Sequence, residues 1–82
     1  MKTIRYTANA ARDLRRYGTM AARLRAALAE YAEDGSAHAN NVTRLVGSTA
    51  LRLRVGDFRI IFAETATELL VTRVGPRGDV YE

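Results

Sequence analysis

The sequence lacks cysteine and contains a single histidine, His38. Without cysteine, a disulfide framework, a zinc-finger pattern and a thiol nucleophile are all excluded. One histidine does not supply a metal site with two histidine ligands, and no acidic cluster suggests Mg²⁺, so we expect no metal and no cofactor. His38 falls in the polar loop Asp34–Asn41, where a solvated side chain is a better interpretation than a catalytic one.

The chain also lacks a long apolar run. No stretch approaches the roughly 20 residues that cross a bilayer, and Met1-Lys2-Thr3 is not followed by the apolar segment of a signal peptide. We therefore expect a cytoplasmic protein without a membrane partner. With 82 residues, of which 48% are apolar, residues 1–82 are expected to form one domain with a small core.

Positive charge is what the chain has in excess. The formal net charge is +4, and the basic residues are one Lys and twelve Arg. Such a balance favours a nucleic acid, an anionic surface or an acidic protein as partner, and Arg presents planar donors that suit phosphate. Genomic base composition also explains Arg in place of Lys, but it does not explain where the arginines are placed.

That placement is clearest in Leu51–Arg59. Apolar residues alternate with Arg52 and Arg54, the pattern of a strand with one buried face. Gly56-Asp57 predicts a two-residue hairpin turn. Closing the hairpin there puts Arg54 directly opposite Arg59, and facing like charges destabilise a sheet by up to about 1 kcal/mol. A fold does not need this arrangement, whereas a polyanionic ligand does.

The remaining patterns predict an α+β fold in the order β-α-α-β-β-β-β, with two helices packed on one face of a twisted, mainly antiparallel sheet. The expected strands are Lys2–Tyr6, Val42–Val46, Leu51–Val55, Phe58–Glu64 and Glu68–Val74. The expected helices are Ala8–Arg16 and Met20–Glu33.

Local signals refine the helices. Thr7 and Thr19 are expected to be their N-caps, with Gly18 ending the first. Asp13 and Arg16 have the spacing of an ion pair within a helix. Apolar spacing predicts that the buried positions include Ala11, Leu14, Tyr17, Met20 and Tyr31, and for the last two core packing is favoured over a ligand stripe.

The last strand is continuously apolar, so its register is the hardest to predict. If Glu64 pairs with Glu68, Arg73 lies opposite Arg59 on the polar face and the core face gains Leu70, Thr72 and Val74. Gly75-Pro76 is expected to end this strand.

One sheet face is thus expected to carry several arginines, joined by two residues of the C-terminal tail. These residues are Arg52, Arg54, Arg59 and Arg73, with Arg77 and Tyr81 from the tail. Fixed cations stabilise the spread negative charge of a phosphoryl-transfer transition state, and a phenol ring suits stacking on an unpaired base. The His and Glu pair that serves many ribonucleases as acid and base is missing. The residues alone therefore favour a phosphate-binding surface over an active nuclease.

Three stretches together resemble the RelE/ParE superfamily of bacterial type II toxins, with the RelE branch the nearer match. They are Arg44–Gly47, Leu51–Phe62 and Val74–Tyr81. The resemblance implies a toxin that cuts mRNA in the ribosomal A site without metal and so inhibits translation. The 2′-OH attacks the adjacent phosphate and leaves a 2′,3′-cyclic phosphate. The resemblance also implies a toxin-antitoxin hetero-oligomer with an acidic, RelB-like antitoxin.

By motif position, the resemblance assigns roles to individual residues. Arg52 and Arg54 match the basic strand pair that binds RNA. Arg59 matches the transition-state arginine, and Arg77 the arginine of a Val-Gly-x-Arg motif. Tyr81 matches the tyrosine that stacks on a base and helps activate the 2′-OH. Two alternatives stay open: a ParE-like DNA gyrase inhibitor that is not an enzyme, and an inactive remnant that only binds antitoxin.

Overall fold

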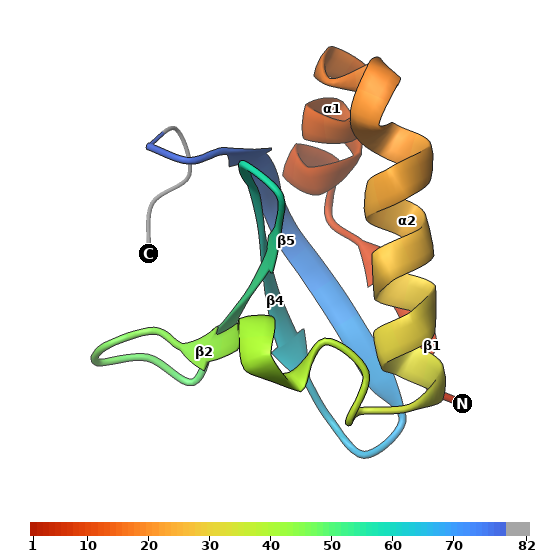
Figure 1. Cartoon of the computed structure of the whole chain (residues 1–82), viewed down its shortest axis with the longest axis vertical. Helices are drawn as coiled ribbons and strands as arrows, with labels where there is room; N and C mark the ends of the chain where they lie inside the picture. Colours follow the sequence, from red (N-terminus) through yellow and green to blue (C-terminus); the bar gives the residue numbers. More distant parts are fainter. Residues whose placement is uncertain (79–82) are drawn as a thin grey trace.

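Two helices cover one face of a five-stranded sheet in the computed structural model, which describes residues 1–78 (Figure 1). The strand order across the sheet is β1-β5-β4-β3-β2; β1 is parallel to β5 and the other pairs are antiparallel. This confirms the predicted α+β fold and element order. None of the helices in the described part is long and apolar enough to cross a membrane. The elements are β1 (Thr3–Tyr6), α1 (Ala8–Arg16), α2 (Gly18–Glu33), a 3-10 turn η1 (Ala39–Asn41), β2 (Val42–Arg44), β3 (Leu51–Val55), β4 (Phe58–Glu64) and β5 (Glu68–Pro76).

The two helices share one linking residue, Tyr17. Its N–H donates to the carbonyl of Asp13 and so ends α1, while its own carbonyl accepts from Met20 and so begins α2. The second helix therefore starts at Gly18, and the prediction that Thr19 caps it is wrong. A connection this short leaves no room for a separate capping residue.

The core lies between the helices and the covered face of the sheet. Met20 and Tyr31 pack in or against it, which confirms that they are core residues, and the Tyr31 ring meets Phe62 edge-on at 5.5 Å. On α1, Leu14 is buried as predicted, but its companion is Ala10 rather than Ala11. Each fully buried Leu, Ile or Phe contributes about 1.5–3 kcal/mol. The largest fully buried side chains are Phe62, Leu24, Leu28, Leu53, Ile60, Leu69, Val71 and Val74.

The β3–β4 hairpin has the predicted register at all of its pairs. Arg54 lies opposite Arg59, Val55 opposite Phe58, and the pairing continues to Leu51 and Phe62. Gly56 in the turn has φ +59°, a left-handed conformation that glycine adopts without strain.

The predicted register of β5 is wrong. Glu64 pairs with Leu69 rather than Glu68, because the Thr65 N–H and hydroxyl both bond to the Glu68 backbone and leave two residues in the loop between them instead of the predicted three. Leu69 and Val71 are therefore buried, and Leu70 is exposed. A register shift between Ile61 and Phe62 then returns Val74 to the core and leaves Thr72 partly exposed. The same shift places Arg73 opposite Ile61, not opposite Arg59.

The outer edge of β5 is covered by two successive segments. β1 pairs with it as far as Val71. Thr7 then bonds to the carbonyls of Val71 and Thr72, and its hydroxyl accepts from the Ala10 N–H, which confirms Thr7 as the N-cap of α1. β5 ends at Pro76, so the strand stops at Gly75-Pro76 as predicted, although it includes these two residues instead of ending at Val74. Within residues 1–78, β1 does not reach this part of the edge of β5, so no neighbouring strand there requires the N–H that proline lacks.

Candidate nucleic-acid interface

Three arginines stand on the sheet face that the helices leave uncovered. Arg52 and Arg54 come from β3 and Arg59 from β4, and they line a shallow hollow of about 110 Å³ together with Asn40, Asn41 and Thr43. We call Arg52, Arg54 and Arg59 the Arg face. Arg54 is exposed and donates from Nη2 to the Asn41 side-chain oxygen at 3.3 Å. The structure therefore brings together the three arginines that alternation alone had predicted.

A small apolar cluster borders the Arg face. Ile61, directly opposite Arg52, is 5% exposed because Leu45 and Ala50 pack over it. The Leu45 N–H donates to the Ala50 carbonyl and holds the β2–β3 connection over the sheet. The hairpin alternation did not reveal this cover, since Leu45 belongs to a separate segment. The apolar cluster lies beside Arg52, whose side chain is half-buried.

Arg77 is held at the turn end of the hairpin. Its backbone N–H donates to the Asp57 carbonyl at 2.7 Å, and Asp57 is in the β3–β4 turn. After β5 the chain moves to the side of the sheet away from the helices (Figure 1). This bond places the Arg77 backbone beside the β3–β4 turn. Tyr81, the other tail residue of the prediction, lies outside the described residues.

Arg73 is positioned by an acidic residue of α1. Its Nε donates to Asp13 Oδ2 at 2.9 Å, and the same oxygen accepts from the Val74 N–H at 2.8 Å. The hydrogen bond and then the charge of Asp13 raise the pKa of Arg73. Asp13 therefore serves β5 rather than Arg16, contrary to the predicted pair within the helix. The cause is that β1 pairs with β5 only as far as Val71, so the buried Val74 N–H needs another acceptor.

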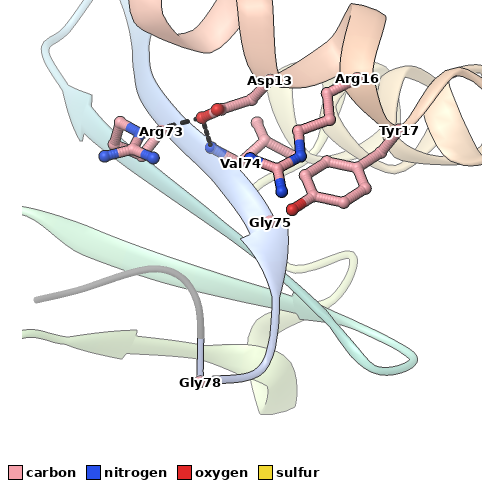
Figure 2. A pocket seen from close by; sticks show the side chains of 7 residues that line it. All are labelled: Asp13, Arg16, Tyr17, Arg73, Val74, Gly75 and Gly78. Carbon is pink, nitrogen blue, oxygen red and sulfur yellow. Dashed lines mark hydrogen bonds and ion pairs between the residues drawn. The ribbon is translucent and has the colours of Figure 1, made fainter.

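A second, larger hollow lies between the end of α1 and the end of β5 (Figure 2). We call it the α1–β5 hollow; its volume is about 300 Å³, and it is lined by Asp13, Arg16, Tyr17, Arg73, Val74, Gly75 and Gly78. The Arg16 Cζ lies 5.4 Å from the centre of the Tyr17 ring, which in turn meets Phe58 edge-on at 5.3 Å. Sequence reasoning missed Arg16 and Tyr17 as site residues, because no local pattern links a helix end to a distant strand.

His38 is not a solvated loop residue. Its Nε2 lies 2.6 Å from Glu30 Oε1, and the side chain is 26% exposed. His38 also has φ +63°, so this contact holds the loop in a conformation that non-glycine residues seldom adopt. His38 also lines a hollow of about 290 Å³ to which Arg54 contributes, and its carbonyl accepts from the N–H of Asn41, the residue that Arg54 contacts.

The far end of the sheet holds a network of opposite charges. Glu64 accepts from the Lys2 ammonium at 2.5 Å and from the Tyr31 hydroxyl at 2.8 Å. Burial, and then the nearby Glu64 carboxylate, raises the pKa of Tyr31 to about 12. Burial also acts to raise the pKa of Glu64, but the bonds from Lys2 and Tyr31 outweigh it and lower that pKa. Within residues 1–78, no three acidic or histidine side chains gather as a potential metal site.

Comparison with known proteins establishes the class to which the fold belongs: the chain has the RelE-like toxin fold. The RelBE2 toxin-antitoxin complex of Mycobacterium tuberculosis contains a chain 24% identical to it, covering 93% of this chain and 98% of that one, with a TM-score of 0.63. For the RelB-RelE antitoxin-toxin complex of Methanococcus jannaschii the identity is 20%, the coverage 89% of both chains and the TM-score 0.70. A variant of YafQ from E. coli is 16% identical over 100% of both chains, with a TM-score of 0.75.

No family model matches the sequence, and no curated protein matches it either. The predicted resemblance is thus confirmed at the level of the fold, by three-dimensional similarity at low sequence identity.

Proposed function

We propose that this chain is the toxin of a type II toxin-antitoxin system. It acts as a ribosome-dependent, metal-independent endoribonuclease that cleaves mRNA in the A site and inhibits translation. The observation that carries the proposal is the Arg face, where Arg54 lies directly opposite Arg59. The RelE-like fold supports it, because solved structures with this fold include RelB-RelE complexes.

The Arg face suits a phosphodiester in electrostatic terms. When a 2′-OH attacks the adjacent phosphorus, the phosphorus–O5′ bond breaks, and a 2′,3′-cyclic phosphate and a 5′-OH form. Negative charge increases on the non-bridging oxygens in the transition state, and preorganised cations stabilise it there more than in the ground state. An RNA phosphate between Arg54 and Arg59 also adds two attractions, which offset the repulsion between the two arginines.

The arginines act as charge clamps and not as proton carriers, because the guanidinium pKa lies above about 12. In the proposed reaction Arg59 and Arg77 stabilise the transition state, while Arg52, Arg54 and Arg73 bind the RNA backbone. The proton that leaves the 2′-OH and the proton that reaches O5′ need another carrier. We assign the activation of the 2′-OH to Tyr81, which also stacks on a base, and the protonation of O5′ to the ribosomal RNA or to water.

The proposed partner that restrains the toxin is an acidic, RelB-like antitoxin. A chain with net charge +4 and a basic sheet face attracts an acidic segment that becomes ordered on binding. Covering the Arg face would exclude RNA and end the activity. The proposed complex is a hetero-oligomer of toxin and antitoxin.

The test is primer extension on cellular mRNA after induced expression of the chain. Wild type is expected to cut within codons, and the cuts are expected to disappear in Arg59→Ala and in Tyr81→Phe. Arg12→Ala is the matched control, since Arg12 is exposed on α1 and is not part of the Arg face. It removes the same charge and is expected to leave cleavage intact.

Other outcomes point to the other hypotheses. Intact mRNA together with DNA damage would indicate a gyrase inhibitor. Normal growth with retained antitoxin binding would indicate an inactive remnant. Unchanged toxicity in both Arg59→Ala and Tyr81→Phe would exclude the proposed mechanism.

A further inference from the structure

The α1–β5 hollow has the charge of an anion site. Arg16 and Arg73 contribute two guanidinium groups, and among the described residues of the lining Asp13 is the one acidic side chain. Asp13 Oδ2 already accepts from the Arg73 Nε and the Val74 N–H, and Asp13 is only 9% exposed. Its carboxylate is therefore occupied within the fold. The described part of the lining keeps a net positive charge toward solvent.

The donors in this hollow are held in place by packing. The ion pair with Asp13 orients Arg73 through Nε, so its two terminal nitrogens are directed elsewhere. Tyr17 is fixed by its edge-on contact with Phe58 and by Arg16 over its ring. Figure 2 shows Arg73 on one side of Asp13, with Arg16 and the Tyr17 hydroxyl on the other. Preorganised donors of this kind suit the several oxygens of a phosphate.

The hollow and the Arg face meet the same row of the sheet. Gly75, which lines the hollow, is the β5 partner of Arg59, and Arg59 is the partner of Arg54. One row across the sheet therefore joins the Arg54–Arg59 pair to the hollow. No side chain stands at the β5 position of that row. A polymer with regularly spaced negative charges fits such a row better than a single anion does.

We propose that the α1–β5 hollow is a second phosphate subsite, which binds a backbone phosphate of single-stranded RNA flanking the phosphate at Arg54 and Arg59. Arg16 and Arg73 supply the charge, and the Tyr17 hydroxyl donates a further hydrogen bond. This subsite rests on the proposed function in taking RNA as the ligand. It concerns binding alone, so it is measurable without cleavage and without the ribosome.

The experiment uses fluorescence anisotropy with a labelled 2′-O-methyl oligoribonucleotide, which lacks the reacting 2′-OH. Arg16→Ala is compared with Arg15→Ala, because both residues are exposed at the end of α1 and only Arg16 lines the hollow. Arg16→Ala is expected to weaken binding about fivefold, as the loss of one charge-assisted contact does. Arg15→Ala is expected to change it less than about twofold, through long-range charge only.

Salt dependence separates a phosphate contact from general attraction. Each phosphate contact to a single strand adds about 0.7 to the slope of log K against log salt concentration. The slope is expected to become shallower by about 0.7 in Arg16→Ala and to stay unchanged in Arg15→Ala. Tyr17→Phe keeps the ring against Phe58 and loses the hydroxyl, so a smaller weakening is expected with no change in thermal midpoint.

Four results would overturn the subsite. The first is an equal loss of RNA affinity in Arg15→Ala and Arg16→Ala, and the second is an unchanged RNA affinity in Arg16→Ala. The third is a wild-type chain that does not bind RNA. The fourth is displacement of the RNA by an oligoglutamate peptide of equal charge, with the same dependence on Arg16. The last result would assign the hollow to an acidic protein segment. Absence of mRNA cleavage in cells, with RNA binding that depends on Arg16, would instead refute the proposed catalysis and leave the subsite in place.

Discussion

The two ends of the β3–β4–β5 sheet treat charge in opposite ways. At the far end Glu64 is held between Lys2 and Tyr31, so a partly buried carboxylate has both a cation and a hydrogen-bond donor. At the turn end Arg54 faces Arg59 across the strands. The first arrangement stabilises the fold, whereas like charges that face each other across strands oppose folding by up to about 1 kcal/mol. Arg54 also donates to the Asn41 side chain and Arg59 to the Phe58 carbonyl. This difference is what supports the proposal of a ligand site at the turn end.

Asp13 links α1 to β5 beside the α1–β5 hollow, and replacing it is expected to have the largest effect on stability. Asp13→Ala leaves the buried Val74 N–H without its acceptor and Arg73 without its partner. The free energy of unfolding is expected to fall by about 2–3 kcal/mol, the cost of an unsatisfied buried donor together with a lost charged bond. Urea denaturation measures it.

Asp13→Asn is the control for that prediction. The amide oxygen still accepts from the Val74 N–H, so this variant is expected to recover about half of the loss. Equal destabilisation by Ala and Asn would mean that the ion pair with Arg73, rather than the strand-edge hydrogen bond, accounts for the effect.

At the far end, Glu64→Gln removes the charge that Lys2 neutralises but keeps an acceptor for Tyr31. The free energy of unfolding at pH 7 is expected to fall by about 1 kcal/mol, and mRNA cleavage is expected to stay at the wild-type level. A loss of cleavage without a loss of stability would mean that the two ends of the sheet are not separate in function.

The same network predicts a loss of stability in alkali. The folded-state pKa of Tyr31 is raised to about 12 from an ordinary value of 10.0, so the fold favours the neutral phenol. Its contribution is complete below pH 10 and is lost as the pH rises toward 12. Urea denaturation across this range is expected to show a steeper fall for wild type than for Tyr31→Phe. Parallel curves would contradict the shift.

At low pH the stability is expected to depend on Glu64, the hydrogen-bond partner of Tyr31. The pKa of Glu64 is lowered in the fold, so its contribution is present above the ordinary glutamate value and is lost as the pH falls through the folded-state pKa. Glu64→Gln is therefore expected to be less sensitive to acid than wild type.

Sequence reasoning was most successful where the information is local. Alternation and the Gly56-Asp57 turn were enough to predict every pair of the β3–β4 hairpin. The β5 register was missed because a continuous apolar run carries no alternation, and because the Thr65 bonds and the register shift depend on the folded chain. The helix link was missed because a single residue, Tyr17, serves both helices.

The candidate site divides in the same way. The Arg face follows from strand parity alone, and the structure brings its members together around one hollow. The α1–β5 hollow joins residues far apart in the chain, Arg16 and Arg73 among them, so no sequence window contains it. Asp13 looked like the partner of Arg16 within its helix, since nothing local indicated that the edge of β5 would need its carboxylate.

The smallest expected change in stability bears on the central claim, that the Arg54–Arg59 pair opposes folding and serves RNA. Arg54→Gln keeps most of the exposed side chain and removes one of the two facing charges. Urea denaturation at low salt should show a free energy of unfolding higher by a few tenths of a kcal/mol to about 1 kcal/mol, while primer extension shows weaker mRNA cleavage. A variant that is less stable than wild type, or one that cleaves mRNA equally well, would contradict the account.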